Sequence, residues 1–178
     1  MKRAELAHVL RAACGVADDP RILVIGSQAI LASFDDSELP EAATRSIEVD
    51  VAFVDDPDEA KSDAVDGAIG ELSRFHETNG FYGQGVGVAT AVLPSGWEDR
   101  LVPFDDPEAA PSRAVCLDPH DLVVSKLVAG REKDLEFARG LIDAGCVDVG
   151  VLEDRANRLL VIPAVKRRVI GRIPPRAR

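Results

Sequence analysis

The sequence predicts an α+β fold, in which helices flank a small mixed sheet and a helical unit follows at the C-terminus. Two short apolar runs, Arg21–Ile25 and Ile47–Phe53, have the length and spacing of strands. From Asp118 onward the apolar residues instead recur at helical spacing. We therefore expect an α/β core over residues 1–117 and a helical unit over residues 118–178, packed together as one compact body.

Composition bounds the class of protein. The chain has 178 residues, of which 46% are hydrophobic and only 4% aromatic, so a globular core must be filled mainly by aliphatic side chains. It contains no apolar run of about 18 residues and no apolar leader after Met1, so we expect a cytoplasmic protein without membrane contact. Cys14, Cys116 and Cys146 are isolated, which argues against a disulfide framework or a zinc site.

The first half of the chain alternates helical and extended patterns. Apolar residues at helical spacing predict a first helix, and Gly26 ends the first strand. A second helical stripe follows the second strand. The expected elements are a helix over Lys2–Val16, a short helix over Gln28–Phe34, an acidic loop over Asp35–Ala43 and a helix over Ala60–Phe75.

The second half begins with a glycine-rich segment, Gly80–Gly87, which predicts a hairpin or a loop. The capping carboxylate of Asp118 followed by Pro119 marks a helix start. The other expected elements are paired strands over Val86–Leu93 and Leu101–Phe104, a short strand over Ala114–Leu117, helices over His120–Ala129, Leu135–Ile142 and Val151–Leu160, and a short helix after Pro163.

Two local features suggest chemistry. Gly26 and Ser27 lie between a buried strand and a helix, where a backbone can approach phosphate closely, although glycine there also serves steric needs. Glu48 and Asp50 share one face of the second strand. Adjacent carboxylates repel each other, and Mg²⁺ would relieve the repulsion; a solvated edge strand is the alternative interpretation.

The order of these features resembles the minimal nucleotidyltransferase fold, whose pattern is a hydrophobic residue, Gly and Gly or Ser, a spacer, and then acid-hydrophobic-acid. Here the pattern reads Ile25-Gly26-Ser27 and then Glu48-Val49-Asp50. Ser46 matches the Ser or Thr that often precedes the first acid by two residues. The chain departs from the family in its first acid, which is glutamate, in a longer spacer, and in a third carboxylate that is not evident.

A third block resembles the C-terminal signature of AbiEii-like toxin–antitoxin nucleotidyltransferases. It carries Lys126 in the helix expected over His120–Ala129, and Arg131, Lys133 and Asp134 directly before the next expected helix. By resemblance, Lys126, Arg131 and Lys133 would face the triphosphate, and Asp134 would be a further catalytic residue. A surface helix with an Arg131–Asp134 ion pair is the alternative interpretation.

The resemblance implies Mg²⁺- or Mn²⁺-dependent transfer of a nucleoside monophosphate from a nucleoside triphosphate to RNA, especially tRNA, or to a protein. Glu48 and Asp50 would hold the metal, and Gly26, Ser27, Arg131 and Lys133 would bind the nucleotide. A cognate antitoxin or another small protein would be a partner. An inactive module of the same fold that binds nucleotide or a partner is the alternative.

The charge distribution bears on the acceptor. The net charge is −10, but six basic and no acidic residues lie in Lys166–Arg178, so the preceding residues carry 15 basic against 31 acidic groups, a balance of −16. A body this acidic repels bulk nucleic acid. The basic end remains a candidate contact for RNA or for an acidic protein surface, or a solvated terminus.

Overall fold

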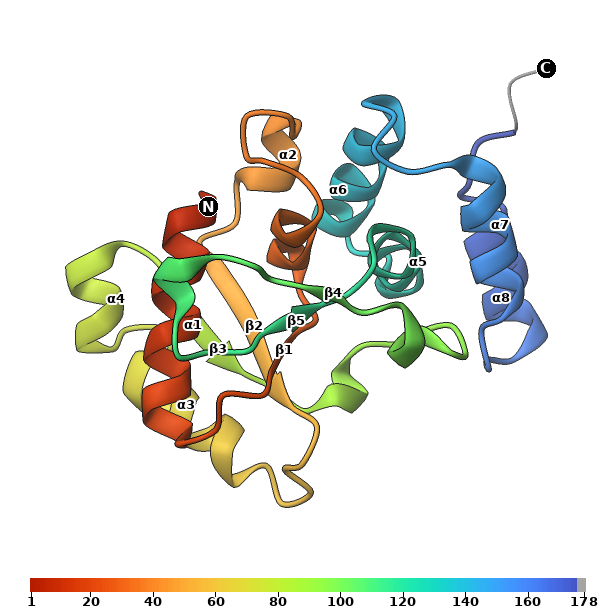
Figure 1. The fold of residues 1–178 in the computed structure, drawn as a ribbon. Coiled ribbons are helices and arrows are strands. Elements are labelled where there is room, and N and C mark those ends of the chain that lie inside the picture. The colour runs from red at the N-terminus through yellow and green to blue at the C-terminus, as the bar shows by residue number, and fades with distance from the viewer. Residues whose placement is uncertain (176–178) are drawn as a thin grey trace.

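A computed structural model describes residues 1–175 and contains a five-stranded mixed sheet with strand order β3-β2-β1-β5-β4 (Figure 1). The central pair β1–β2 is antiparallel, and so is the outer pair β4–β5; β1 runs parallel to β5, and β2 parallel to β3. The strands are β1 (Ile22–Val24), β2 (Glu48–Phe53), β3 (Tyr82–Gly85), β4 (Val102–Pro103) and β5 (Val115–Cys116).

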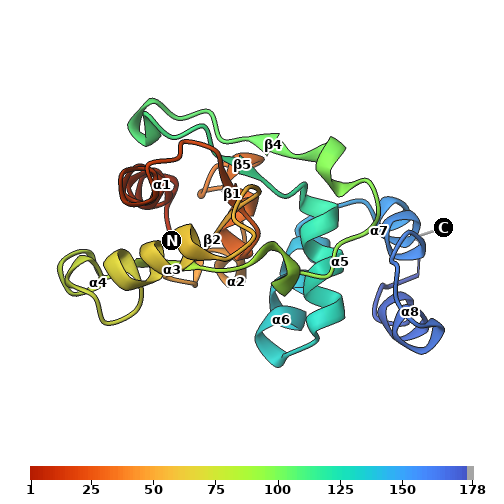
Figure 2. The ribbon, with the colours of Figure 1, turned by 90° about the horizontal axis from the view of Figure 1, so that it is seen from below.

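The larger helices gather on two sides of the sheet (Figures 1 and 2). One side holds α1 (Arg3–Ala17), α3 (Ala60–Ile69) and α4 (Arg74–Asn79), and the other holds α5 (Pro119–Ala129), α6 (Glu132–Asp143), α7 (Val149–Asn157) and α8 (Pro163–Ile170). The mixed sheet with flanking helices confirms the predicted α+β class. Shorter helical turns are η1 (Ser27–Ala32), α2 (Glu41–Thr44), η2 (Val88–Thr90), η3 (Trp97–Arg100) and η4 (Pro107–Ala109).

The two faces of β2 have opposite chemistry. Val49 and Val51 are fully buried. Gly83, which pairs with Val49, has Val9 of α1 and Ile69 of α3 directly above it, so this face packs on those helices. Glu48 and Asp50 therefore project to the other side, toward α5 and α6, as the period of two predicts.

The glycine-rich segment Gly80–Gly87 contains β3, a parallel neighbour of β2. Its glycines let α1 and α3 pack directly on the strand: a Cβ on Gly85 would lie 1.8 Å from the carbonyl oxygen of Ser62 in α3, and one on Gly83 would lie 2.8 Å from the side chain of Val9 in α1. The prediction of a hairpin or loop was therefore wrong, because close helix packing explains glycine within a strand.

Three other predictions need correction. Val86–Leu93 is no strand but an irregular segment with η2, and β4 pairs with β5 instead. The helix expected over Ala60–Phe75 breaks at Gly70, and Leu72 has a φ of 62° with 82% of its surface exposed. Ser73 caps a new helix by accepting a hydrogen bond from the His76 amide. The acidic loop ends in one helical turn, α2.

Helix α5 begins where the cap predicted a helix start, because the Asp118 carboxylate accepts from the amides of His120 and Asp121. Two basic groups of the last segment are used internally: Lys166 donates to the carbonyl of Asn157, and Arg172 to that of Leu127. Arg167 and Arg168 are exposed, while Arg176 and Arg178 lie outside the described residues. Within residues 1–175, no helix is long and apolar enough to cross a membrane. All three cysteines are free.

Candidate active site

Gly26 and Asp50 are in direct contact where β1 ends. The amide of Ile25 donates to the carbonyl of Asp50, which extends the β1–β2 pairing up to the turn. A Cβ added to Gly26 would lie 1.7 Å from Oδ2 of Asp50. The backbone of Gly26 is extended, with φ of −91°, so this position needs glycine for space and not for its dihedral angles. The glycine thus makes room for the carboxylate.

Glu48 is held by two hydroxyl groups. Its amide donates to Oγ of Ser46 at 3.2 Å, which fixes the start of β2. The phenol of Tyr82, its register partner on β3, donates to Oε2 of Glu48 at 3.4 Å. Burial, and secondarily the charge of Glu48, raises the pKa of Tyr82 to about 12. The phenol therefore remains a donor at neutral pH.

Asp50 is partly buried and carries an unfavourable charge. Burial, and secondarily the charge of the neighbouring Glu48, raises the pKa of Asp50 to about 6. The charges of Lys126 and Lys133 act in the opposite direction. Two carboxylates on one strand face thus resist joint ionisation. A cation placed between them would relieve this repulsion.

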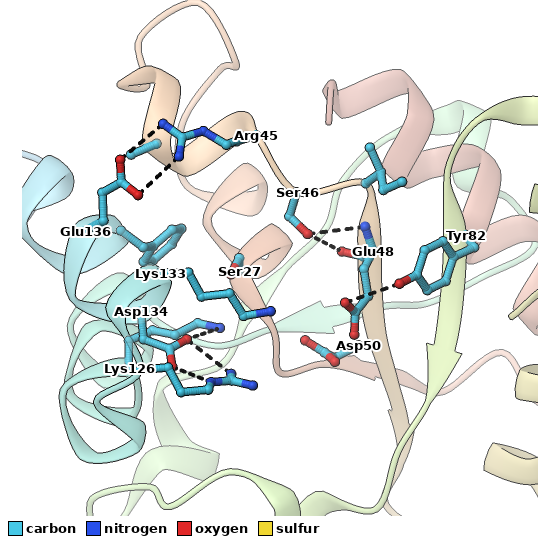
Figure 3. A pocket seen from close by; sticks show the side chains of 14 residues that line it. Ser27, Arg45, Ser46, Glu48, Asp50, Tyr82, Lys126, Lys133, Asp134 and Glu136 are labelled. Carbon is cyan, nitrogen blue, oxygen red and sulfur yellow. Dashed lines mark hydrogen bonds and ion pairs between the residues drawn. The ribbon is translucent and has the colours of Figure 1, made fainter. Parts of the chain in front are cut away.

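The opposite wall of the site comes from α5 and α6 (Figure 3). The carboxylate of Asp134, only 2% exposed, lies 3.6 Å from Nζ of Lys126 and accepts from Arg131 through Nε at 2.7 Å and a terminal nitrogen at 3.2 Å. Burial alone would raise the pKa of Asp134, but the hydrogen bond from Arg131 and the charge of Lys126 hold this pKa below its usual value. Asp134 thus orients Lys126 and Arg131, and its own charge is neutralised by them.

Lys133 differs from its neighbours. Among residues 1–175 no carboxylate forms a hydrogen bond or ion pair with its ammonium group, and its side chain extends across the pocket toward Glu48 and Asp50 (Figure 3). The two walls enclose a pocket of about 360 Å³, within the range of roughly 300–1,000 Å³ that ligand sites occupy. Its lining includes Ser27, Arg45, Ser46, Ile47, Glu48, Asp50, Tyr82, Lys126, Arg131, Lys133, Asp134, Glu136 and Phe137.

The structure therefore brings seven of the eight sequence-predicted site residues to one pocket, and the eighth, Gly26, lies beneath Asp50. Glu98 and Asp99, the two acidic residues of η3, do not line this pocket, so neither supplies a third carboxylate there. Ile47, the residue before β2, is 46% exposed and lines the pocket, although strand alternation would place it on the same face as the buried Val49 and Val51.

Sequence reasoning missed an ion pair at the rim. Arg45, beside α2, donates twice to Glu136 of α6, at 3.1 Å each (Figure 3). The two residues are 91 positions apart, so no local pattern could join them. The sequence indicated a role for Tyr82 at the site only weakly, through its position as the one tyrosine of the chain within the glycine-rich segment Gly80–Gly87.

The donor set fits a divalent cation of the Mg²⁺ type. Glu48 and Asp50 offer carboxylate oxygens on one face, and Asp50 reaches its position only because Gly26 has no side chain. Among the described residues, no three His, Cys, Asp or Glu side chains form a metal-binding cluster. Mg²⁺ is commonly held by one or two carboxylates together with substrate phosphates, so two protein ligands suffice when the substrate brings the rest.

A sheet with a Gly-Ser turn against an acid-x-acid strand, facing a cationic helical wall, defines a site of the nucleotidyltransferase class. The chain belongs to the family described as nucleotidyltransferase of unknown function (DUF6036), whose model matches residues 4–168. This membership implies a nucleotide substrate. No curated protein and no solved structure is significantly similar to the chain.

Proposed function

We propose that this protein transfers a nucleoside monophosphate from a nucleoside triphosphate to an acceptor, with Mg²⁺ or Mn²⁺ held by Glu48 and Asp50. Family membership supports nucleotidyl transfer in general terms. The observation that carries the specific proposal is the opposition of the two carboxylates to Lys126, Arg131 and Lys133 across one pocket.

The charges of the pocket are matched to a metal–phosphate ligand. Arg45 and Glu136 neutralise each other, and Asp134 neutralises one of its two cationic partners. The strand side then keeps two negative charges, and the helix side keeps two positive charges, one of them on Lys133. A divalent cation would balance the strand side, and phosphate oxygens would balance the helix side.

Each residue has a role in the proposed reaction. Ser27 and the adjoining backbone bind the terminal phosphates, while Lys126, Arg131 and Lys133 offset the negative charge that develops as pyrophosphate leaves. Asp134 acts by positioning Lys126 and Arg131. Tyr82 and Ser46 orient Glu48. The chemistry that a bound Mg²⁺ supplies is polarisation of the α-phosphate and activation of the acceptor hydroxyl.

The finer predictions from sequence belong to this proposal. The resemblance to AbiEii-like proteins favours RNA, in particular tRNA, or a protein as acceptor, and a toxin–antitoxin or defence role with a cognate antitoxin or another small protein as partner. A cytoplasmic location is likewise a prediction from sequence. The acceptor and partner predictions rest on the block Lys126 to Asp134.

The experiment that tests the proposal measures transfer. The protein is incubated with each of four α-labelled nucleoside triphosphates, Mg²⁺ or Mn²⁺, total tRNA and the protein itself. We expect metal-dependent labelling of an acceptor and release of pyrophosphate. Asp50→Ala should abolish both while leaving the circular dichroism spectrum unchanged.

Two matched variants separate chemistry from folding. Asp99→Ala removes an exposed acid outside the pocket and should transfer like the wild type. Wild-type activity in Asp50→Ala would refute the assignment. Metal-dependent binding of a triphosphate without turnover would instead support the alternative, an inactive nucleotide-binding module of the same fold.

A further inference from the structure

A second hollow adjoins the pocket. It has a volume of about 210 Å³, and its lining includes Asp50, Lys126 and Arg131, which also line the larger pocket. These three side chains therefore stand between the two hollows. A group entering the second hollow would reach Asp50 from a different side than a nucleotide in the first.

The remaining lining of the second hollow is uncharged. Val86, Thr90 and Ala91 come from the segment after β3, and Ser125 and Ala129 from α5. The described residues around it supply small apolar groups and two hydroxyls, and no charge beyond the three shared side chains. The chemistry of this surface suits a neutral group.

The size of the hollow limits what enters it. At about 210 Å³ it is smaller than the roughly 300 Å³ at which ordinary ligand pockets begin, so it admits one side chain or part of a molecule. A nucleic acid would also need cations for the phosphates on either side of its reacting hydroxyl. The cations that line the hollow, Lys126 and Arg131, are shared with the first pocket, and the body before Lys166 has a balance of −16. In the described part of the basic C-terminal segment, Lys166 and Arg172 are engaged internally, which leaves Arg167 and Arg168 exposed.

We propose that this second hollow is the acceptor subsite and that it takes a neutral hydroxyl side chain of a protein, from Ser, Thr or Tyr. The inference rests on the proposed function. In the step, the acceptor oxygen forms a bond to the α-phosphorus, and the bond from that phosphorus to the bridging oxygen of the β-phosphate breaks. Pyrophosphate leaves, and the hydroxyl proton passes to water.

The test uses the full chain with two kinds of acceptor and two readouts. The acceptors are capped tripeptides with Ser, Thr or Tyr between alanines, and total tRNA. The readouts are transfer from α-labelled triphosphates and, separately, calorimetric binding of α,β-methylene triphosphates, which cannot be cleaved at that bond. We expect metal-dependent labelling of a peptide and none of tRNA.

Variants that fill one hollow at a time distinguish the subsites. Ala129→Trp and Thr90→Trp occupy the second hollow from exposed positions, and Ala42→Trp occupies the first pocket. Ala129→Trp and Thr90→Trp should lower peptide labelling about a hundredfold because they displace the acceptor, and they should leave analogue binding unchanged. Ala42→Trp should lose analogue binding. Ala164→Trp, an exposed position on α8, should behave like the wild type.

The outcomes separate this inference from the proposed function. Labelling of tRNA in place of peptide, or wild-type labelling by both hollow-filling variants, overturns the acceptor assignment and leaves nucleotidyl transfer standing. Analogue binding without transfer to any acceptor overturns both the acceptor assignment and the transfer step. If no analogue binds with Mg²⁺, the proposed function fails at its first step.

Discussion

The strand-borne and helix-borne halves of the site handle charge in opposite ways. On β2, Glu48 and Asp50 are like charges, and burial and proximity raise the pKa of Asp50 to about 6. On α5 and α6, the buried Asp134 is surrounded by cations that lower its pKa. Asp134 is thus compensated by cations of the protein, whereas the charges of Lys126 and Lys133 only partly offset the repulsion between Glu48 and Asp50.

This difference separates residues that stabilise the fold from residues that cost stability. Removing one member of a buried, compensated ion pair is strongly destabilising. Relieving a pair of like charges should have the opposite effect, because active sites commonly hold destabilising groups that function requires. The two halves of one pocket therefore predict mutations of opposite sign.

The largest expected effect is on Asp134. Asp134→Asn should lower the free energy of unfolding by about 3 kcal/mol, because Lys126 and Arg131 lose their shared carboxylate. Chemical denaturation at neutral pH measures it, with Asp143→Asn on the exposed end of α6 as a control that changes stability by less than about 0.5 kcal/mol. Equal stability of the two variants would contradict the compensated network.

The same variant predicts a pH dependence. A carboxyl whose pKa is lowered on folding contributes stability above its unfolded value, 3.8, and loses that contribution as pH falls through the folded value. The difference between wild type and Asp134→Asn should therefore be full at neutral pH and shrink below about pH 4.

The next largest effect is expected at the contact between the Gly-Ser turn and the carboxylate pair. Gly26→Ala should destabilise by about 1–3 kcal/mol, since the new Cβ would lie 1.7 Å from Asp50 Oδ2, and it should weaken Mg²⁺-dependent nucleotide binding as Asp50 moves. Gly67→Ala in α3, with open space around its Cβ, should instead stabilise by about 0.5–1 kcal/mol. Wild-type binding by Gly26→Ala would show that the turn does not position the acid.

Asp50→Asn should stabilise the metal-free protein, which is the reverse of Asp134→Asn. The folded protein keeps the Asp50 proton up to about pH 6, and the unfolded chain loses it near 3.8, so wild-type stability falls as pH rises through this window. In chelator, the variant should gain about 1–3 kcal/mol at pH above 6 and nothing below about pH 3.8. A gain that persists at the lower pH would exclude charge as the cause.

The smallest effect is expected at Tyr82. Tyr82→Phe removes one long hydrogen bond to Glu48, so the free energy of unfolding should change by less than about 1 kcal/mol. Since the pKa of the phenol is raised to about 12, the effect should be constant between about pH 6 and 9. Nucleotide binding should weaken only severalfold. A hundredfold loss would assign Tyr82 a direct contact with the ligand.

Local sequence patterns predicted much of the site. Strand alternation put Glu48 and Asp50 on one face, and glycine between a strand and a helical turn marked Gly26 and Ser27. Capping by Asp118 and Pro119 located the start of α5, and hence Lys126 on its last turns. Each of these signals depends on backbone periodicity or capping within a few residues, which the sequence contains directly.

Other features needed the assembled chain. Gly80–Gly87 carries the composition of a loop, yet it forms β3, because α1 and α3 require a strand surface without side chains. The helix expected over Ala60–Phe75 ends at Gly70 and a new helix begins after the N-cap Ser73, although the apolar residues continue at helical spacing. The composition of Val86–Leu93 favours a strand paired with β4, but the segment is irregular and β4 pairs with β5 instead.

The sequence by itself determined the α+β class and the shared face of the two carboxylates, because strand and helix periods are local properties of the chain, whereas the cationic block was predicted from a resemblance. Only the tertiary structure decided that Asp134 compensates Lys126 and Arg131 and leaves Lys133 facing the acids, that Arg45 meets Glu136, and that a second hollow lies behind Asp50. Such relations depend on distances between segments far apart in sequence, and they are set by the packing of α5 on η1 and of α6 on α5 and α2.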